Sequence, residues 1–268
     1  MSKLPAAAAV IAATVFAVPG SAQQGVLLRF TPPVGQVTHY RNVNQTWMQI
    51  PGMSAGDTSV PTMTQTMYTT KTVTAASGSS RVVSTTVDSS ARQMPGMEGM
   101  MPSGDMFRGM VTIQRIDPLG RVDSVSVTPP PGADPMLAEA LQRGASSNRS
   151  SLPLPERALG VGDSWTDSLS IPLSAGMGGA LTTFHLTYRL DRIERVGGAR
   201  VAVISMTGAI GTDGAGAAGA AQGTMSGQFR FDLDASRLIS VTNDMTGEIQ
   251  GPSGSMPMRS HTVTEVLP

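Results

Sequence analysis

Two short stretches in the second half of the chain alternate between apolar and polar residues with a period of two. In TFHLTYRLD, residues 183–191, the even-numbered positions are apolar, and in QFRFDLD, residues 228–234, the odd-numbered positions are apolar. Successive side chains on a β-strand point to opposite faces of a sheet. Each stretch therefore predicts a strand with one buried and one solvated face, which is typical of an antiparallel sheet.

Runs rich in threonine and valine predict further strands, because β-branched residues favour strands and are poorly tolerated in helices. These runs occupy residues 37–50, 62–74, 81–87, 107–116, 122–128, 200–207, 238–245 and 262–267. One stretch predicts a helix, in which Asp134 is a suitable N-cap, Pro135 suits the first turn, and an apolar stripe runs on to Gly144. The glycine- and alanine-rich residues 208–223 predict a surface loop.

Two pairs of similar segments indicate an internal repeat. VGQVT at 34–38 is similar to VGDSWT at 161–166, and IDPLGRVDSV at 116–125 is similar to LDASRLISV at 233–241. The second pair has the order strand, Asp-led turn, Arg, strand, which predicts a hairpin in each half of the chain.

The patterns together predict a mainly β fold. We expect a large curved antiparallel sheet or half-barrel, built from two similar β-rich halves at residues 23–128 and 156–268. A proline-rich linker with one short helix, residues 129–155, connects them. Two separate domains are the alternative, but the similar segments are too short to indicate independent cores.

Residues 1–22 have the features of a secretory signal peptide. A basic start containing Lys3 precedes an apolar run at 4–18, and small residues follow up to Ala22, where cleavage is expected. A membrane anchor is the alternative, although the apolar run is shorter than the ~20 residues that span a bilayer. We therefore expect a periplasmic or extracellular protein with no transmembrane span after signal cleavage.

The composition excludes several classes of function. Lys and Arg number 19, as do Asp and Glu, so no basic excess is available for a nucleic-acid partner. The absence of cysteine excludes disulfides, thiol nucleophiles and cysteine-ligated metal centres. Hydrophobic residues make up 40% of the chain but aromatic residues only 4%, so aliphatic side chains must fill the core.

The segment LPLPE at 152–156, followed by LGVGDSW at 159–165, carries a family resemblance. It resembles the L-P-x-x-x-V-x-x-G-D-x-W stretch of uncharacterised exported bacterial β-proteins, which are known only as domains of unknown function. The resemblance implies an exported β fold and supplies no catalytic residues. In physical terms, we expect structural roles: Gly162 and Asp163 form a turn, and Trp165 begins a strand and anchors a core poor in aromatic residues.

The other chemical motifs are weak. GAGAAG at 214–219 matches the dinucleotide-binding glycine pattern, but no helix long enough to hold a pyrophosphate can follow it before the next strand. His39, His185 and His261 lie in separate predicted strands; a three-histidine metal site is one alternative and solvated histidines are the other. Serine motifs of known hydrolases do not occur, and the acidic residues are scattered.

Methionine is unusually frequent, with 18 residues in the chain. Met94, Met97, Met100 and Met101 lie close together in a Gly- and Pro-rich stretch within residues 94–110. Thioethers are soft ligands that select Cu(I) and Ag(I), so this loop is a candidate metal site. Methionine is also a flexible apolar filler, and a mobile hydrophobic cover is the competing interpretation.

Three functions follow from these observations. We expect a non-enzymatic exported protein that binds an apolar small molecule or lipid, or an envelope protein, on its curved sheet, and that needs no cofactor. The alternative is a Cu(I) or Ag(I) module centred on the methionine-rich loop. A hydrolase is the third hypothesis, which requires a fold that gathers Asp, His and Ser in one cleft.

Overall fold

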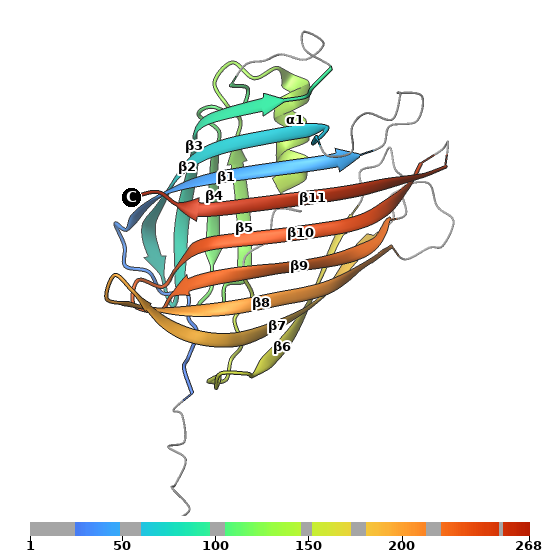
Figure 1. Ribbon diagram of the computed structural model, residues 1–268. Coiled ribbons are helices and arrows are strands. Elements are labelled where there is room, and N and C mark those ends of the chain that lie inside the picture. Colours follow the sequence, from blue (N-terminus) through green and yellow to red (C-terminus); the bar gives the residue numbers. More distant parts are fainter. Residues whose placement is uncertain are drawn as a thin grey trace, which may run out of the picture.

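The computed structural model of the protein describes residues 25–48, 60–96, 105–145, 152–172, 181–212, 221–251 and 254–268. These residues form one 11-stranded sheet and a single α-helix (Figure 1). The strands are β1 (Val37–Met48), β2 (Met63–Ser77), β3 (Ser80–Gln93), β4 (Val111–Ile116), β5 (Val122–Thr128), β6 (Ser164–Pro172), β7 (Leu181–Val196), β8 (Ala199–Thr212), β9 (Ala221–Asp232), β10 (Arg237–Gly251) and β11 (Gly254–Val266). The helix, α1 (Pro135–Ala145), lies between β5 and β6 in the chain.

The strand order is β5-β4-β3-β2-β1-β11-β10-β9-β8-β7-β6, and all pairs are antiparallel. Each strand pairs with its neighbour in the chain, except that β1 pairs with β11 from Tyr40↔Val266 to Met48↔Met258. This pairing joins the two halves of the chain into one sheet whose edges are β5 and β6. The predicted fold class, a large curved antiparallel sheet with one short helix between two β-rich halves, is confirmed.

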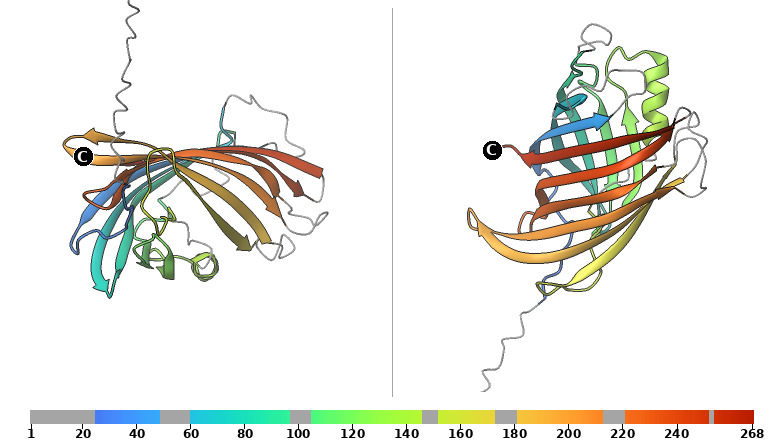
Figure 2. Two further views of the ribbon diagram at one scale, coloured as in Figure 1. Left: turned by 90° about the horizontal axis from the view of Figure 1, so that it is seen from below. Right: turned by 45° about the vertical axis from the view of Figure 1, so that its right-hand side comes forward.

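The sheet bends into an arc, and α1 lies on its concave side (Figure 2, left). α1 begins as the sequence predicts: Asp134 Oδ1 accepts the backbone N–H of Leu137 at 2.8 Å. The helix packs against β5, so it covers one edge of the sheet.

The predicted strands are confirmed in position and differ in length. The main correction concerns residues 208–223, for which the composition predicted a surface loop. β8 continues to Thr212 and β9 begins at Ala221, so both ends of this stretch are strand, and residues 213–220 lie outside the described residues. At Gly208 and Gly223, glycine is tolerated because the neighbouring backbone approaches closely.

Aspartate-led turns join strands in both halves. Asp117 Oδ1 accepts the backbone N–H groups of Leu119 and Arg121, both at 2.8 Å, between β4 and β5. Asp232 Oδ1 accepts the N–H groups of Asp234 and Ala235 between β9 and β10. Both turns use a carboxylate that accepts backbone N–H groups, but the second uses Asp232 and not Asp234, the residue that the sequence similarity aligns with Asp117. The internal repeat itself stays a prediction.

The hydrophobic core occupies only part of the concave side. One cluster belongs to the second half of the sheet and is made by the buried residues Leu28, Leu152, Leu154, Leu159, Tyr188, Leu190, Ala202, Ile204, Met206, Phe229 and Phe231. A smaller cluster in the first half contains Val73, Val83, Ile116 and Val122. Phe30 packs against both clusters and so connects them.

Two extended segments, residues 25–36 and 152–163, cross the concave side and supply the cover for this core. Val26 and Leu159 form an antiparallel bridge in which the Val26 N–H donates to the Leu159 carbonyl at 2.8 Å. Phe30 and Leu154 donate backbone hydrogen bonds to the Asp117 turn, at the carbonyls of Pro118 and Leu119. Nowhere in the described part of the chain does a helix have the length and apolar character to cross a membrane.

Candidate ligand-binding face

A group of partly exposed methionines lies on the concave face, and one of them, Met225, packs against the main core cluster. The buried side chains of Tyr40, Ile204 and Phe229 identify that face, and residues an even number of positions away on a regular strand share it. The methionines placed there by register are Met48, Met63, Met67, Met225, Met245, Met256 and Met258, here called the concave methionines. All of them are partly exposed.

The pairing register places several of these methionines next to one another across the sheet. Met258 lies opposite both Met48 on β1 and Gly247 on β10. In the adjacent row, Met245 lies opposite Met225, which in turn lies opposite Gly208 on β8. Residues that face each other across strands are close enough to pack, so Met48 contacts Met258 and Met245 contacts Met225, while Thr46 and Ser260 stand between Met63 and Met245.

Glycines interrupt this surface where the strands approach most closely. Gly223 on β9 and Gly247 on β10 are register partners. A Cβ on Gly223 would lie 2.8 Å from the Gly247 Cα and closer still to the Thr246 carbonyl oxygen. A Cβ on Gly208 would lie 2.6 Å from the His185 carbonyl oxygen. The bare backbone at these positions allows the sheet to bend sharply and leaves the floor of the concave face open.

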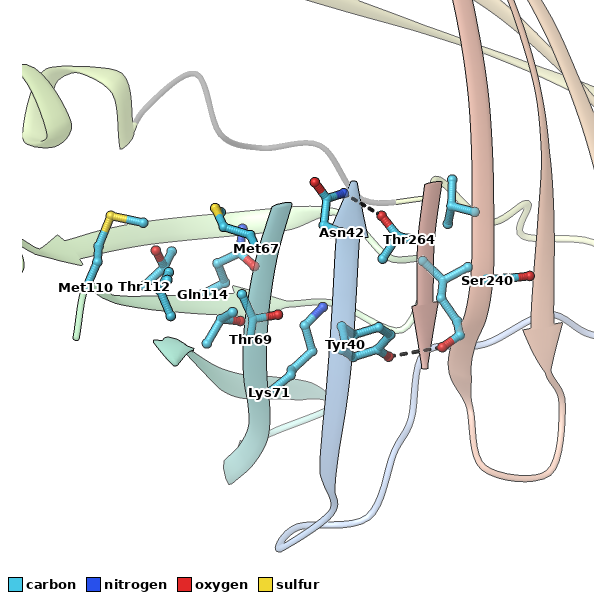
Figure 3. Close-up of a pocket in the computed structure, with 14 residues that line it drawn as sticks. Tyr40, Asn42, Met67, Thr69, Lys71, Met110, Thr112, Gln114, Ser240 and Thr264 are labelled. Atoms are coloured by element: carbon cyan, nitrogen blue, oxygen red, sulfur yellow. Dashed lines mark hydrogen bonds between the residues drawn. The ribbon is translucent and has the colours of Figure 1, made fainter. Parts of the chain in front are cut away.

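A pocket of about 280 Å³ lies on the same face, between the two core clusters and the concave methionines. Figure 3 shows the side chains that line it, which come from β1 to β4, β10 and β11 and from the turn before β4. They are Tyr40, Asn42, Met67, Thr69, Lys71, Thr85, Val87, Met110, Thr112, Gln114, Leu238, Ser240, Val241 and Thr264. The lining combines hydroxyl and amide groups with aliphatic side chains, so the pocket suits an amphiphilic ligand better than a purely apolar one.

Lys71 and Tyr40 dominate the electrostatics of this pocket. Lys71 Nζ lies 5.4 Å from the centre of the Tyr40 ring, in a cation–π arrangement that is visible in Figure 3. Burial lowers the pKa of Lys71 below its ordinary value of 10.5. Burial raises the pKa of Tyr40 to about 12, and the nearby positive charge of Arg237 opposes this shift. The Tyr40 hydroxyl donates to the Leu238 carbonyl at 3.0 Å.

The residues that the sequence singled out for structural roles lie at the start of β6. Gly162 has a φ of 95°, which favours glycine, and its N–H donates to the Leu190 carbonyl at 2.7 Å. Asp163 Oδ2 accepts from Arg157 at 2.6 Å and from the Gly160 N–H, and the Arg157 hydrogen bond is the main cause of the lowered pKa of Asp163.

Trp165, the second residue of β6, contributes to the main core. Its ring stacks on Tyr188 with centroids 5.3 Å apart, and its Nε1–H donates to the Pro153 carbonyl at 2.8 Å. This hydrogen bond connects the start of β6 to the LPLPE segment.

The described residues contain the candidate histidine site but only one residue of the candidate methionine site, which therefore stays a prediction. Met97, Met100 and Met101 lie outside them, and Met94 follows the end of β3. His39, His185 and His261 lie on the convex face, on β1, β7 and β11. Across the described ranges, no three His, Asp or Glu side chains form a group that could bind a metal ion.

Sequence reasoning missed both the concave methionines and Lys71. Part of the signal was present, because Met63 and Met67, and Met256 and Met258, are spaced by even numbers and so share a face of a strand. The chain contains only two lysines, Lys3 and Lys71, and the second lies within a run of threonines. That Lys71 points into a pocket depends on the pairing of β2 with β1 and β3, which no local pattern indicates.

Comparisons with known proteins found no matching family model and no matching curated protein. The geometry of the concave face therefore carries the functional argument alone.

Proposed function

We propose that the protein is an exported, non-enzymatic binding protein that holds a lipid-like ligand against its concave face. The observation that carries the proposal is the set of concave methionines, which remain partly exposed beside a core that fills only part of the same face. Methionine side chains are flexible and polarisable, so they adapt to apolar ligands of irregular shape.

The form of the face favours a small ligand over a protein partner. The pocket of about 280 Å³ is close to the lower end of the size range of small-molecule sites, roughly 300–1,000 Å³. Met67 lines the pocket and faces the same side of the sheet as the other concave methionines, and one polar row, Gln65, Asn44, Thr262 and Asn243, lies between the pocket and the rows of Met245 and Met258. A ligand with a polar end in the pocket and an apolar tail on the methionines would use the whole of this surface.

The proposal can be tested with a neutral fluorescent probe, N-phenyl-1-naphthylamine, and a double variant, Met48→Ser with Met258→Ser. These residues are register partners and belong to neither core cluster, so the fold should persist. Burying a methionine side chain contributes roughly 1.5–3 kcal/mol, and partial contact with two of them should make probe binding at least about tenfold weaker in the variant.

Met136→Ser is the matched control, because Met136 lies on α1 and is 79% exposed. It should bind the probe like the unmodified protein. Failure of the unmodified protein to bind the probe, or equal binding by the double variant, would remove the proposal. Native mass spectrometry of protein purified from its own envelope would then show whether a lipid or an envelope protein is retained.

A further inference from the structure

The pocket contains a positive charge without a nearby negative one. Lys71 is the only lysine in residues 25–268, and its side chain lines the pocket. In the part of the chain that the structure describes, no carboxylate forms an ion pair with Lys71; its ammonium group lies over the face of the Tyr40 ring. A partly buried ammonium group with only an aromatic partner is poorly solvated, and a bound anion would relieve this.

A second cation lies beside the first. Arg237 reaches across from β10 to Thr38 on β1, with Nη1 donating to the Thr38 hydroxyl at 3.3 Å. Thr38 is the register partner of Lys71. Arg237 Nε is buried and has no hydrogen-bond partner, and within the described residues Arg237 also lacks an ion pair. Arg237 therefore lies near Tyr40 and Thr38 but does not line the pocket itself, so Lys71 is the cation of the lining.

Such an arrangement favours a ligand with a negative charge at Lys71. Cations that are already neutralised by acidic neighbours attract a ligand weakly, whereas unpaired ones retain their full attraction. The other side chains of the lining are uncharged, so no acidic group of the pocket repels an anion.

We propose that Lys71 binds the anionic headgroup of an amphiphile whose apolar tail lies on the concave methionines. This inference rests on the proposed function and names the ligand class. The direction of the tail follows from β2, on which Lys71, Thr69, Met67, Gln65 and Met63 share the concave face. Eight residues separate Lys71 from Met63, or roughly 26 Å of strand, a length that accommodates an extended acyl chain.

The test compares two ligands that differ only in the headgroup, dodecanoate and dodecanol, with the unmodified protein and with Lys71→Met. Methionine keeps the length and apolar character of the lysine side chain and removes its charge. We expect the unmodified protein to bind dodecanoate at least about tenfold more tightly than dodecanol. Lys71→Met should abolish this preference without changing the affinity for dodecanol.

Arg115→Met is the charge-matched control. Arg115 lies on the convex face of β4 in an exposed pair with Asp123 at 3.7 Å, so its removal changes the net charge but not the pocket. This control should keep the preference for dodecanoate. Acetate serves as the headgroup without a tail, and binding of acetate as tight as that of dodecanoate would overturn the assignment to an amphiphile.

The pH dependence of the unmodified protein supplies a second measurement that does not depend on a variant folding. The preference for dodecanoate should disappear as the pH rises through the pKa of Lys71, at a pH below 10.5. Tyr40 titrates at a higher pH, because burial raises its pKa to about 12. Equal affinities for dodecanoate and dodecanol at all pH values would refute the role of Lys71 and leave the proposed function standing, whereas binding of neither would refute both.

Discussion

The close approach of β9 and β10 at Gly223 predicts a large effect from the addition of one methyl group. In Gly223→Ala, the new Cβ would lie 2.8 Å from the Gly247 Cα and in collision with the Thr246 carbonyl oxygen. Both are backbone atoms, so relief requires the two strands to move apart and weakens their pairing. Overpacking of this kind costs about 1–3 kcal/mol, and the lower entropy of the unfolded alanine chain offsets only about 0.4–1 kcal/mol.

Gly211→Ala provides the matched control. Gly211 lies in β8, and a Cβ there would meet nothing within 4 Å. It should leave the protein equally stable or slightly more stable, for the same entropic reason. In urea unfolding followed by circular dichroism, we expect Gly223→Ala to be less stable than this control by about 1–3 kcal/mol. In a protein of this size, that difference corresponds to a lowering of Tm by roughly 2–12 °C.

The partner glycine allows a sharper version of the experiment. A Cβ on Gly247 would lie 3.1 Å from the Gly223 Cα, so both substitutions strain the same contact. Once the first alanine has separated the strands, the second should cost less, and the double variant should lose less stability than the sum of the single ones. Equal stability of Gly223→Ala and Gly211→Ala would refute the argument that the backbones must approach closely here.

Three further changes test individual side chains. Lys71→Met should raise the free energy of unfolding at pH 7 by about 0.5–2 kcal/mol. Because the pKa of Lys71 is lowered in the folded state, the unmodified protein gains stability as the pH rises from that pKa to 10.5. Urea unfolding at several pH values should therefore show that the greater stability of Lys71→Met disappears over this pH range. Trp165→Phe should lose about 1 kcal/mol in thermal unfolding, because it keeps the ring but not the hydrogen bond to Pro153. The hydrogen bond from Arg230 is the main cause of the lowered pKa of Glu194. The ionised Glu194 therefore stabilises the fold fully above pH 4.5, and this contribution is lost as the pH falls through the folded pKa. Glu194→Gln should remove this part of the loss of stability in acid.

The sequence predicted the sheet and the helix because their signals are local. Alternation over 183–191 lies within β7, and the side chain of Asp134 caps α1 as its position before Pro135 indicates. Such signals depend on a few neighbouring residues, and the contacts of the folded protein do not override them here. Alternation does not show which strands pair, so only the structure shows the pairing of β1 with β11 that joins the two halves of the sheet.

The glycine-rich stretch shows where local reasoning fails. Isolated glycines weaken a strand, so residues 208–223 favoured a loop by composition. In the structure, Gly208 and Gly223 are placed in strands because a neighbouring carbonyl oxygen occupies the space of a side chain. That reason is a contact between strands distant in sequence, and no window of the sequence contains it.

The candidate site was missed for a related reason. The sequence drew attention to the methionines clustered at 94–101, whereas the concave methionines come from five strands and share a face only through register. Scattered methionines in strands look like ordinary core residues, because methionine fills gaps in many cores. What sets these apart is that they are partly exposed while Met206, on the same face, is buried.

The division of the concave face explains how one sheet can be well packed in one part and partly exposed in another. The segments 25–36 and 152–163 complete the core at one end, where Leu28 and Leu159 are almost fully buried. Stability is therefore concentrated in the covered part, and the exposed methionines and the unpaired charge of Lys71 contribute little to it. Features that weaken a fold persist when they serve binding. The proposed ligand would cover the methionines and neutralise Lys71, and it would thus stabilise the open part of the face as the two segments stabilise the core.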